Sequence, residues 1–294
     1  MRTSLLAFAL AVACGHSAPG VPDAGPDGGV PDGGLVGARP YSLHVPPGYA
    51  AGQPAPLVIL LHGYGASGEL QEAYFQLTPL ADAKTFLYAT PDGTLDPGGR
   101  RFWNATDACC DLYGSGVDDV AYINAIIDDV ERRYTVDPKR VYLIGHSNGG
   151  FLAHRLACDS ASRIAGIVSL AGAQWKARSH CAPAQKVAVL QVHGTADDTI
   201  SYTGGSIGAA AYPSAAETVA NWAAFDGCGA LDTSAPNRDI EAGIPGNETT
   251  VARYTGCAGG AVELWSIQGG GHLPTLVPDW PSQIYGFLGA HPKP

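Results

Sequence analysis

Residues 141–149 read Val-Tyr-Leu-Ile-Gly-His-Ser-Asn-Gly, and this stretch decides the fold. A short apolar run, typical of a buried strand, ends in the pattern Gly145-x-Ser147-x-Gly149, and an amphipathic run typical of a helix follows. This order predicts a sharp strand-to-helix turn that holds the serine hydroxyl out at the edge of a sheet. Glycine is expected on both sides because neighbouring backbones pass too close there for a side chain. The alternative interpretation is a structural turn in which the serine has no chemical role.

A candidate acidic partner for Ser147 follows a later strand. Residues 186–192 predict a buried parallel strand, and this run leads into His193-Gly-Thr-Ala-Asp197. In α/β-hydrolases the triad follows the chain order serine, then aspartate or glutamate, then histidine. Asp197 lies in the loop just past the strand, which is where the acid belongs. The adjacent Asp198 is the alternative, and we expect it to cap the following turn instead.

A candidate base lies further along the chain. The strand predicted over residues 262–267 is followed by Gln268-Gly-Gly-Gly-His272. Of the nine histidines, only His272 and His291 follow Asp197. His291 lies three residues from the chain end, where fraying is the default. Elimination therefore leaves His272 as the base.

Serine, histidine and aspartate in this arrangement supply the parts of a nucleophilic catalyst. A neutral imidazole within hydrogen-bond reach removes the serine proton during attack, and a buried carboxylate fixes the tautomer of that imidazole. Two backbone N–H groups must also face the developing oxyanion. We expect one from Asn148, which follows the serine, and one from Tyr64, in the loop after the strand predicted over residues 56–61. Gly63 and Gly65 are the alternatives for the second donor.

Composition indicates one folded domain that does not bind nucleic acid. The chain has 294 residues, of which 46% are hydrophobic, and this is enough for one sizeable core. The formal net charge is −10 and the sequence has no basic patch, so nucleic acid is not an expected partner. The sequence contains no Cys-x-x-Cys or His-x-x-x-His spacing, so we expect no metal site. We expect the protein to be a monomer.

The N-terminal segment indicates export. It has a short basic start and an apolar run that is too short for a permanent transmembrane helix, as in a secretory signal. Cys14 follows small residues in a pattern that resembles the bacterial lipoprotein processing box, so we predict a signal peptide over residues 1–14 and a lipid on Cys14. A plain secreted protein is the alternative. Residues 15–37, in which Pro-Asp-Gly-Gly repeats, predict a disordered tether, and residues 38–294 predict the folded domain.

Six further cysteines indicate three disulfides, because an even number in an exported chain is typical of a disulfide framework. They are Cys109, Cys110, Cys158, Cys181, Cys228 and Cys257. We predict the pair Cys228–Cys257, since Gly227-Cys228 and Gly256-Cys257 bracket one insertion. The sequence leaves the other pairings open.

Strand and helix patterns alternate from residue 56 onward. This alternation predicts an α/β fold, with a mostly parallel central sheet and helices on both faces. Apolar residues recur at spacings of three and four over residues 117–134, which is typical of an amphipathic helix. The acidic residues of this helix are expected to form a solvated face: Asp118, Asp119, Asp128, Asp129 and Glu131. In such sheets ligands bind beyond the carboxyl ends of the strands, where the three candidate residues all fall.

Several motifs together resemble one known family. They are Asn104-Ala-Thr-Asp-Ala-Cys-Cys110, Val117-Asp-Asp-Val120, Gly145-His-Ser-Asn-Gly-Gly150, His193-Gly-Thr-Ala-Asp197 and Gly269-Gly-Gly-His272. In this order they are similar to the secreted esterases that include polyhydroxybutyrate depolymerases and feruloyl esterases, and the resemblance covers most of residues 40–290. It implies an α/β-hydrolase fold and an exported serine esterase without a cofactor. It also implies that Ser147 is the nucleophile, Asp197 the acid and His272 the base.

The resemblance also bears on the substrate. Trp103 matches a tryptophan beside the Asn-Ala motif of the family, so Trp103 and His62 are candidates for contact with the substrate, with a core aromatic and a hydrogen-bond partner as the alternatives. The expected substrate is an ester of plant cell-wall polysaccharide, such as a feruloyl or acetyl group on xylan. A polyhydroxyalkanoate is the closest alternative, and peptidase or lipase activity is a more distant one. A tethered binding protein that keeps the fold without turnover is the alternative from another class.

Overall fold

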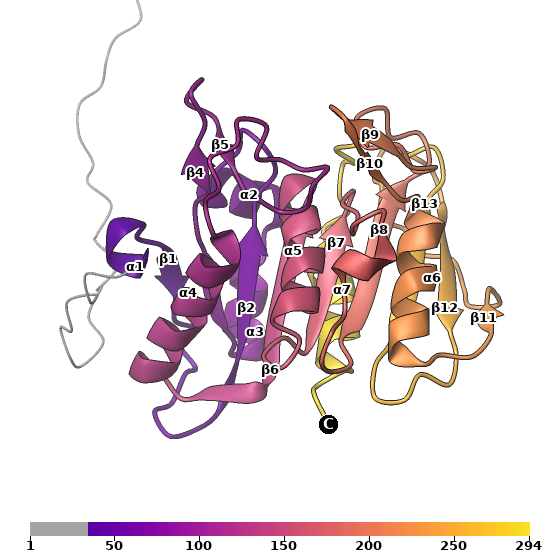
Figure 1. Cartoon of the computed structure of the whole chain (residues 1–294). Coiled ribbons are helices and arrows are strands. Elements are labelled where there is room, and N and C mark those ends of the chain that lie inside the picture. Colours follow the sequence, from indigo (N-terminus) through magenta and orange to yellow (C-terminus); the bar gives the residue numbers. More distant parts are fainter. Residues whose placement is uncertain (1–34) are drawn as a thin grey trace, which may run out of the picture. The chain divides into compact units, whose positions relative to one another are not determined.

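The computed structural model describes residues 35–294, which are built around a nine-stranded sheet (Figure 1). In spatial order the strands are β1 (Ser42–His44), β3 (Leu87–Thr90), β2 (Ala55–Leu61), β6 (Val136–His146), β7 (Gly166–Leu170), β8 (Ala188–Gly194), β13 (Val262–Ile267), β12 (Thr249–Tyr254) and β11 (Leu231–Asp232). Neighbours from β3 to β13 are parallel, whereas β1, β12 and β11 pair antiparallel at the two ends. The predicted mostly parallel sheet of an α/β-hydrolase is confirmed.

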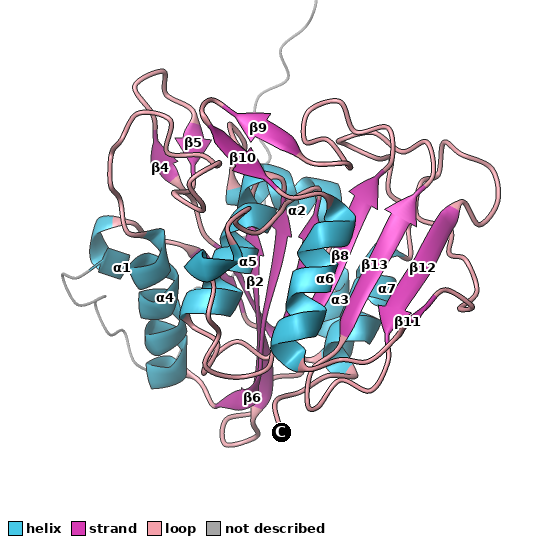
Figure 2. Ribbon diagram, turned by 45° about the vertical axis from the view of Figure 1, so that its right-hand side comes forward, coloured by secondary structure: helices cyan, strands magenta, loops and turns pink. Residues whose placement is uncertain are grey.

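Helices cover both faces of this sheet (Figure 2). Successive strand residues point to opposite faces, so Leu57 and Val58 of β2 enter two different apolar cores. The core with Leu57 includes side chains of α4 (Asp119–Arg133), α5 (Asn148–Asp159) and α6 (Ala215–Asp226). The core with Val58 includes side chains of α2 (Gly68–Phe75), α3 (Thr78–Lys84) and α7 (Trp280–Gly289). Burial on both faces explains why these strands have continuous apolar runs.

Two small hairpins stand at the edge of the sheet where the parallel strands end (Figure 1). One consists of β4 (Thr94–Leu95) and β5 (Arg101–Phe102), and the other of β9 (Gly205–Ile207) and β10 (Ala210–Tyr212). A short 3-10 helix, η1 (Arg178–His180), lies in the connection between β7 and β8. The hairpins and the loops beside them therefore border the edge at which ligands bind in sheets of this kind.

The folded part begins slightly before the predicted boundary. Residues 35–37 were assigned to the tether, but they belong to α1 (Leu35–Ala38), in which Val36 is buried and joins a core. The predicted signal peptide, Cys14 and the rest of the tether lie outside the described residues. Within residues 35–294, no helix combines the length and apolar character needed to cross a bilayer.

The expected solvated acidic face of α4 is wrong for two of its residues. Asp119 is fully buried, with Oδ1 accepting from Arg39 at 2.8 Å and Oδ2 accepting from the backbone N–H of Asn104 at 2.6 Å. Asp129 is also buried and accepts from the Tyr41 hydroxyl at 2.6 Å. Helical periodicity cannot reveal these partners, because Arg39 and Tyr41 come from a distant part of the chain.

All six cysteines of the described chain form disulfides. The predicted pair Cys228–Cys257 is present and links the end of α6 to the loop after β12. The other two pairs, which the sequence left open, are Cys158–Cys181 and the adjacent Cys109–Cys110. Cys109 and Cys110 lie in the loop that leads from β5 to α4, next to the candidate site.

Candidate active site

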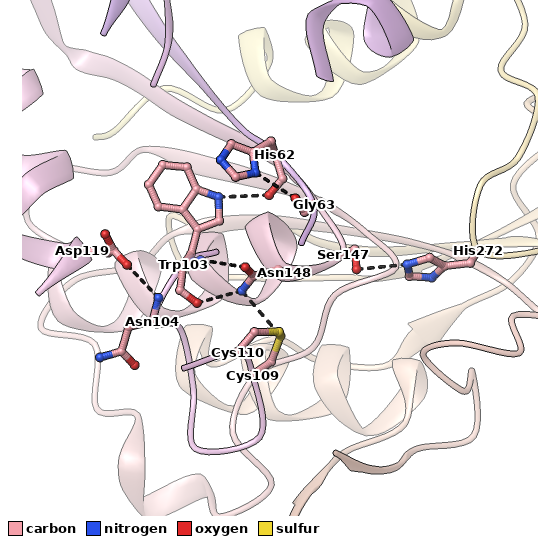
Figure 3. Close-up of a disulfide and its surroundings, with 10 residues drawn as sticks. All are labelled: His62, Gly63, Trp103, Asn104, Cys109, Cys110, Asp119, Ser147, Asn148 and His272. Atoms are coloured by element: carbon pink, nitrogen blue, oxygen red, sulfur yellow. Dashed lines mark hydrogen bonds between the residues drawn. A yellow bond between two sulfur atoms is a disulfide. The ribbon is translucent and has the colours of Figure 1, made fainter. Parts of the chain in front are cut away.

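Three side chains from three loops meet at the carboxyl edge of the sheet. Ser147 stands between β6 and α5, and its Oγ lies 3.0 Å from Nε2 of His272 (Figure 3). Nδ1 of His272 lies 2.8 Å from Oδ2 of Asp197. The structure thus brings together the three residues predicted from separate motifs. Since the carboxylate only accepts, His272 carries its proton on Nδ1 and presents a free Nε2 lone pair to the serine hydroxyl.

Close backbone packing explains the turn at Ser147. The serine has φ 52° and ψ −118°, in the left-handed half of backbone space that non-glycine residues rarely occupy. A Cβ on Gly149 would overlap the carbonyl oxygen of Leu61, and one on Gly145 would overlap that of Gly149. The strained turn is anchored by the Ser147 N–H, which donates to the carbonyl of Leu170 at 2.8 Å. These contacts explain why glycine flanks the serine on both sides.

Asp197 is held as a buried carboxylate. Oδ1 accepts from the backbone N–H groups of Thr199 and Ile200 at 2.9 and 2.8 Å, while Oδ2 faces His272 and lies 3.3 Å from Nε2 of His193. Burial alone would raise the pKa of Asp197, but the hydrogen bonds with His193 and His272 hold it well below its usual range. Asp197 is therefore ionised at neutral pH. The alternative acid, Asp198, is exposed and accepts a hydrogen bond from the Thr199 hydroxyl at 3.3 Å.

His146 lies against the loop that carries His272. It is buried beside the turn, and its Nε2 lies 3.1 Å from the backbone carbonyl of His272. Burial lowers the pKa of His146 to about 4, so the ring is neutral at pH 7. Because the carbonyl only accepts, Nε2 carries the single ring proton. The histidine beside the serine therefore fixes the loop that carries His272.

The loop after β2 offers one unpaired amide. The N–H of Gly63 donates to Oε1 of Gln71 at 3.1 Å, and the N–H of Gly65 donates to the carbonyl of Arg101 at 2.8 Å. Within the part of the chain that the structure describes, the N–H of Tyr64 has no hydrogen-bond acceptor, and neither does that of Asn148. The loop lies against the serine, because a Cβ on Gly63 would come within 3.6 Å of the Ser147 Cβ. Of the three amides considered, Tyr64 is the one free to bind a further acceptor.

The side chain of Asn148 links the start of α5 to the loop that follows β5 (Figure 3). Its Oδ1 accepts from the N–H of Trp103 at 2.7 Å, and its Nδ2 donates to the carbonyl of the same residue at 2.9 Å. Nδ2 also lies 3.5 Å from the Cys109 sulfur. The indole N–H of Trp103 donates in turn to the carbonyl of His62 at 2.9 Å. A continuous set of hydrogen bonds thus connects the start of α5 to the loop that contains Tyr64.

Trp103 and His62 lie in the interior, which favours the alternatives of a core aromatic and a hydrogen-bond partner over a place on the substrate surface. Both are fully buried and pack on each other with ring centroids 4.8 Å apart. Burial lowers the pKa of His62 to about 4, and its Nε2 accepts from the N–H of Gly93 at 2.8 Å. Both residues are part of the bracing of the loop instead. Nothing in the local sequence indicates the related role of Gln71, whose buried side chain accepts from the N–H of Gly63.

Several large apolar side chains are exposed in the chain segments that follow the parallel strands β2, β3 and β13. Leu273 directly follows His272 and is 66% exposed, and Leu70 in the first turn of α2 is 61% exposed. The others come from β4 and from the loop after the adjacent cysteines: Leu95, Leu112 and Tyr113. Over residues 35–294, no group of three or more histidine, cysteine, aspartate or glutamate side chains is placed to hold a metal ion.

Comparisons with known proteins agree with this architecture. Residues 49–221 match the model of the phospholipase/carboxylesterase family. NocK of Nocardia uniformis subsp. tsuyamanensis, which carries the name of an esterase, is 32% identical over 85% of this chain and 72% of its own length. Feruloyl esterase B of Piromyces equi is 30% identical over 80% of this chain, which spans 42% of that protein.

A solved structure supports the fold alone. The acetyl xylan esterase from Aspergillus awamori superposes with a TM-score of 0.60 over 84% of this chain and 92% of its own, at 17% sequence identity.

Proposed function

Because the chain belongs to the phospholipase/carboxylesterase family of α/β-hydrolases, we propose that it is a serine esterase that uses Ser147, His272 and Asp197 as its triad. One observation carries the proposal: hydrogen bonds of 3.0 and 2.8 Å run without a break from the serine hydroxyl through the imidazole to the carboxylate. Asp197 is ionised and buried, as the acid of a triad must be.

The geometry supports a two-step reaction. Nε2 of His272 takes the proton of Ser147 as Oγ attacks the ester carbonyl, and the Asp197 carboxylate stabilises the imidazolium that forms. The oxyanion is bound by the free backbone N–H groups of Tyr64 and Asn148. His272 then returns the proton to the departing alcohol, which leaves an acyl group on Ser147. Water, activated by His272 in the same way, releases the acid and restores the hydroxyl.

Two substitutions test the triad. Ser147→Ala and His272→Ala should each lower kcat on p-nitrophenyl acetate by a factor of order 10⁴. His291→Ala is the matched control, since it removes a histidine whose Nδ1 contacts only the carbonyl of Phe287 near the chain end. Near wild-type turnover in either triad variant would refute the assignment. A folded wild-type protein that hydrolyses no ester would favour the alternative of a tethered binding protein.

For the substrate we propose an ester on plant cell-wall polysaccharide, with a feruloyl or acetyl group on xylan as the class. Relatives named feruloyl esterase B, feruloyl esterase D and bifunctional acetylxylan esterase/xylanase support this choice. Leu273, which is exposed and directly follows His272 in the chain, suits an aromatic acyl group better than a bare sugar.

A side-by-side assay decides among the substrates. The purified protein should be offered methyl ferulate, acetylated xylan and short 3-hydroxybutyrate oligomers, and the values of kcat/KM compared. The proposal predicts the highest value for one of the first two. A clear preference for the hydroxybutyrate oligomers would instead assign a polyhydroxyalkanoate depolymerase.

We further propose that the protein is exported and anchored by a lipid on Cys14, with residues 1–14 as signal peptide. Three disulfides suit an oxidising compartment and support export. Cys14→Ser should move the enzyme from the membrane fraction to the soluble fraction. Unchanged recovery with membranes would contradict lipidation. We also propose that the protein is a monomer, which light scattering of the Cys14→Ser variant would test.

A further inference from the structure

His193 contacts the same carboxylate oxygen as the candidate base. It is the penultimate residue of β8 and is 1% exposed. Its Nε2 lies 3.3 Å from Oδ2 of Asp197 and 2.8 Å from the carbonyl oxygen of Ile200. Oδ2 also receives Nδ1 of His272 at 2.8 Å. Two imidazoles therefore face one oxygen, one on the side of the serine and one on the side of the core.

A chain of buried hydrogen bonds continues from His193 across the core to α6. Nδ1 of His193 lies 3.2 Å from Nε2 of Gln191, and Oε1 of Gln191 lies 2.9 Å from Nε2 of His154. Nδ1 of His154 lies 3.0 Å from the indole nitrogen of Trp222. Trp222, His154 and Gln191 are all 0% exposed. The chain thus runs through the interior, out of reach of solvent.

The indole N–H of Trp222, at one end of these hydrogen bonds, determines the donor and acceptor in each of them. An indole N–H only donates, so Nδ1 of His154 must accept and Nε2 must carry the ring proton. Burial lowers the pKa of His154 to about 4, which keeps the ring neutral with one proton. Gln191 then accepts from His154 through Oε1 and donates through Nε2. Nδ1 of His193 must accept that proton, which leaves the ring proton on Nε2, where the carbonyl of Ile200 accepts it at 2.8 Å and Oδ2 of Asp197 lies 3.3 Å away.

The near end dictates the same direction independently. A reversed chain would aim the Nε2 lone pair of His193 at the Ile200 carbonyl and the Asp197 carboxylate, which are both acceptors. It would also turn Oε1 of Gln191 toward the carbonyl of Gly172, to which Nε2 now donates at 2.8 Å. Both reversals place lone pairs against lone pairs in a buried site, which is unfavourable.

We propose that His193 is a positioning residue whose Nε2–H, bonded to the carbonyl of Ile200, also faces Oδ2 of Asp197 and limits the basicity of His272. This inference rests on the proposed triad. The positive end of this N–H offsets part of the negative charge on Oδ2, so the imidazolium of His272 is stabilised less than it would be without His193. A weaker stabilisation of the imidazolium predicts that the enzyme stays active to a lower pH.

Other titratable groups around the pair do not reproduce this effect. They are His146 at the end of β6, Tyr74 on α2, Tyr202 after β8, and the acidic residues Asp198 and Glu241. Burial lowers the pKa of His146 to about 4 and raises that of Tyr74, so both stay neutral from pH 5 to 9. Asp198 is exposed, and Glu241 is committed to backbone N–H groups of Gly243 and Thr275 at 3.0 and 2.7 Å.

The test is the pH dependence of kcat/KM in three variants of the full chain. His193→Phe removes the donor and should move the acid limb to higher pH by about 0.5 to 1 unit. His193→Gln restores an N–H donor and should recover at least half of that shift. Trp222→Phe is the matched control at the far end of the series of hydrogen bonds. It should lower the melting temperature while the acid limb stays in place. An unmoved acid limb in His193→Phe overturns the proposal, as does an equal shift in Trp222→Phe.

A measurement on the unaltered protein keeps the proposal testable if His193→Phe does not fold. Long-range ¹H–¹⁵N correlation spectra at neutral pH should show His193 and His154 as Nε2–H tautomers, and an Nδ1–H tautomer at either position overturns it. Ser147→Ala and His272→Ala are assayed alongside. If they retain wild-type rates, the proposed function fails. If they are inactive while the His193 variants leave the acid limb unmoved, only the role of His193 fails.

Discussion

Removing the side chain of Asn148 should damage both stability and turnover. Its amide pairs with the N–H and the carbonyl of Trp103 at 2.7 and 2.9 Å, and both residues are completely buried. Asn148→Ala leaves the buried N–H of Trp103 without an acceptor, while the carbonyl of Trp103 still accepts from the N–H of Cys110 at 3.2 Å. Because one buried group loses its partner, we expect the free energy of unfolding to fall by about 1–3 kcal/mol. Urea unfolding followed by circular dichroism measures this change.

The effect on turnover follows from the backbone of the same residue. The N–H of Asn148 is a proposed oxyanion donor, and the loss of one such donor lowers kcat by about 10²–10³. Asn148→Ala keeps the amide but frees the start of α5 from Trp103, so we expect a fall in kcat of about 10- to 100-fold. KM should change little, because the contact strengthens in the transition state rather than with bound substrate.

Asn124→Ala is the matched control for this experiment. Asn124 is a partly buried amide on α4 that donates to the carbonyl of Val120 at 2.9 Å and to the hydroxyl of Ser160 at 2.7 Å, away from the site. Its loss should lower stability and leave kcat unchanged. If Asn148→Ala lowers kcat no more than Asn124→Ala, the proposed link between the Trp103 loop and the oxyanion site is refuted.

Two further predictions concern stability and the turn. Burial raises the pKa of Asp226 to about 6, although Val187, Lys186 and Lys293 oppose the rise. The folded state therefore holds this proton more tightly than the unfolded state does. The stability that results is lost as the pH rises from about 4 to above 6. Asp226→Asn should therefore raise the free energy of unfolding at pH 8 by up to about 3 kcal/mol and change it little at pH 4, as urea unfolding at the two values would show; an equal change at both values would refute the cause. Gly149→Ala forces a Cβ onto the carbonyl of Leu61. The variant should therefore lose its activity, and its melting temperature should fall by at least 10 °C, roughly the effect of a few kcal/mol. A fully active variant with an unchanged melting temperature would show that the turn has more room than the structure gives it.

Local sequence patterns were enough to predict most of the fold and the three residues Ser147, Asp197 and His272. The turn at Ser147, the strand before Asp197 and the glycine-rich loop before His272 each have a signal within a few neighbouring residues. Parallel strands then bring their carboxyl ends to one edge of the sheet, so the convergence of the three residues needs no knowledge of distant contacts. This is why sequence order alone was enough to predict which side chains would meet.

The misassigned residues depend on partners far away in the chain. Trp103 was expected at the substrate surface, but Asn148 and His62 bind it from two other segments and bury it. Asp119 was expected in solvent, but Arg39 covers it. The choice of Tyr64 over its glycine neighbours likewise depends on acceptors outside its own loop. No periodicity or motif encodes such contacts, because they form only when separate elements pack together.

The most direct test of the proposed nucleophile is the site at which a fluorophosphonate attaches. The intact protein is treated with the reagent, digested and mapped by mass spectrometry. We predict one adduct, on the peptide that contains Ser147, which disappears in Ser147→Ala and forms far more slowly in His272→Ala. An adduct on a different residue, or a protein that cleaves esters without taking up the label, would contradict the assignment of Ser147 as the nucleophile.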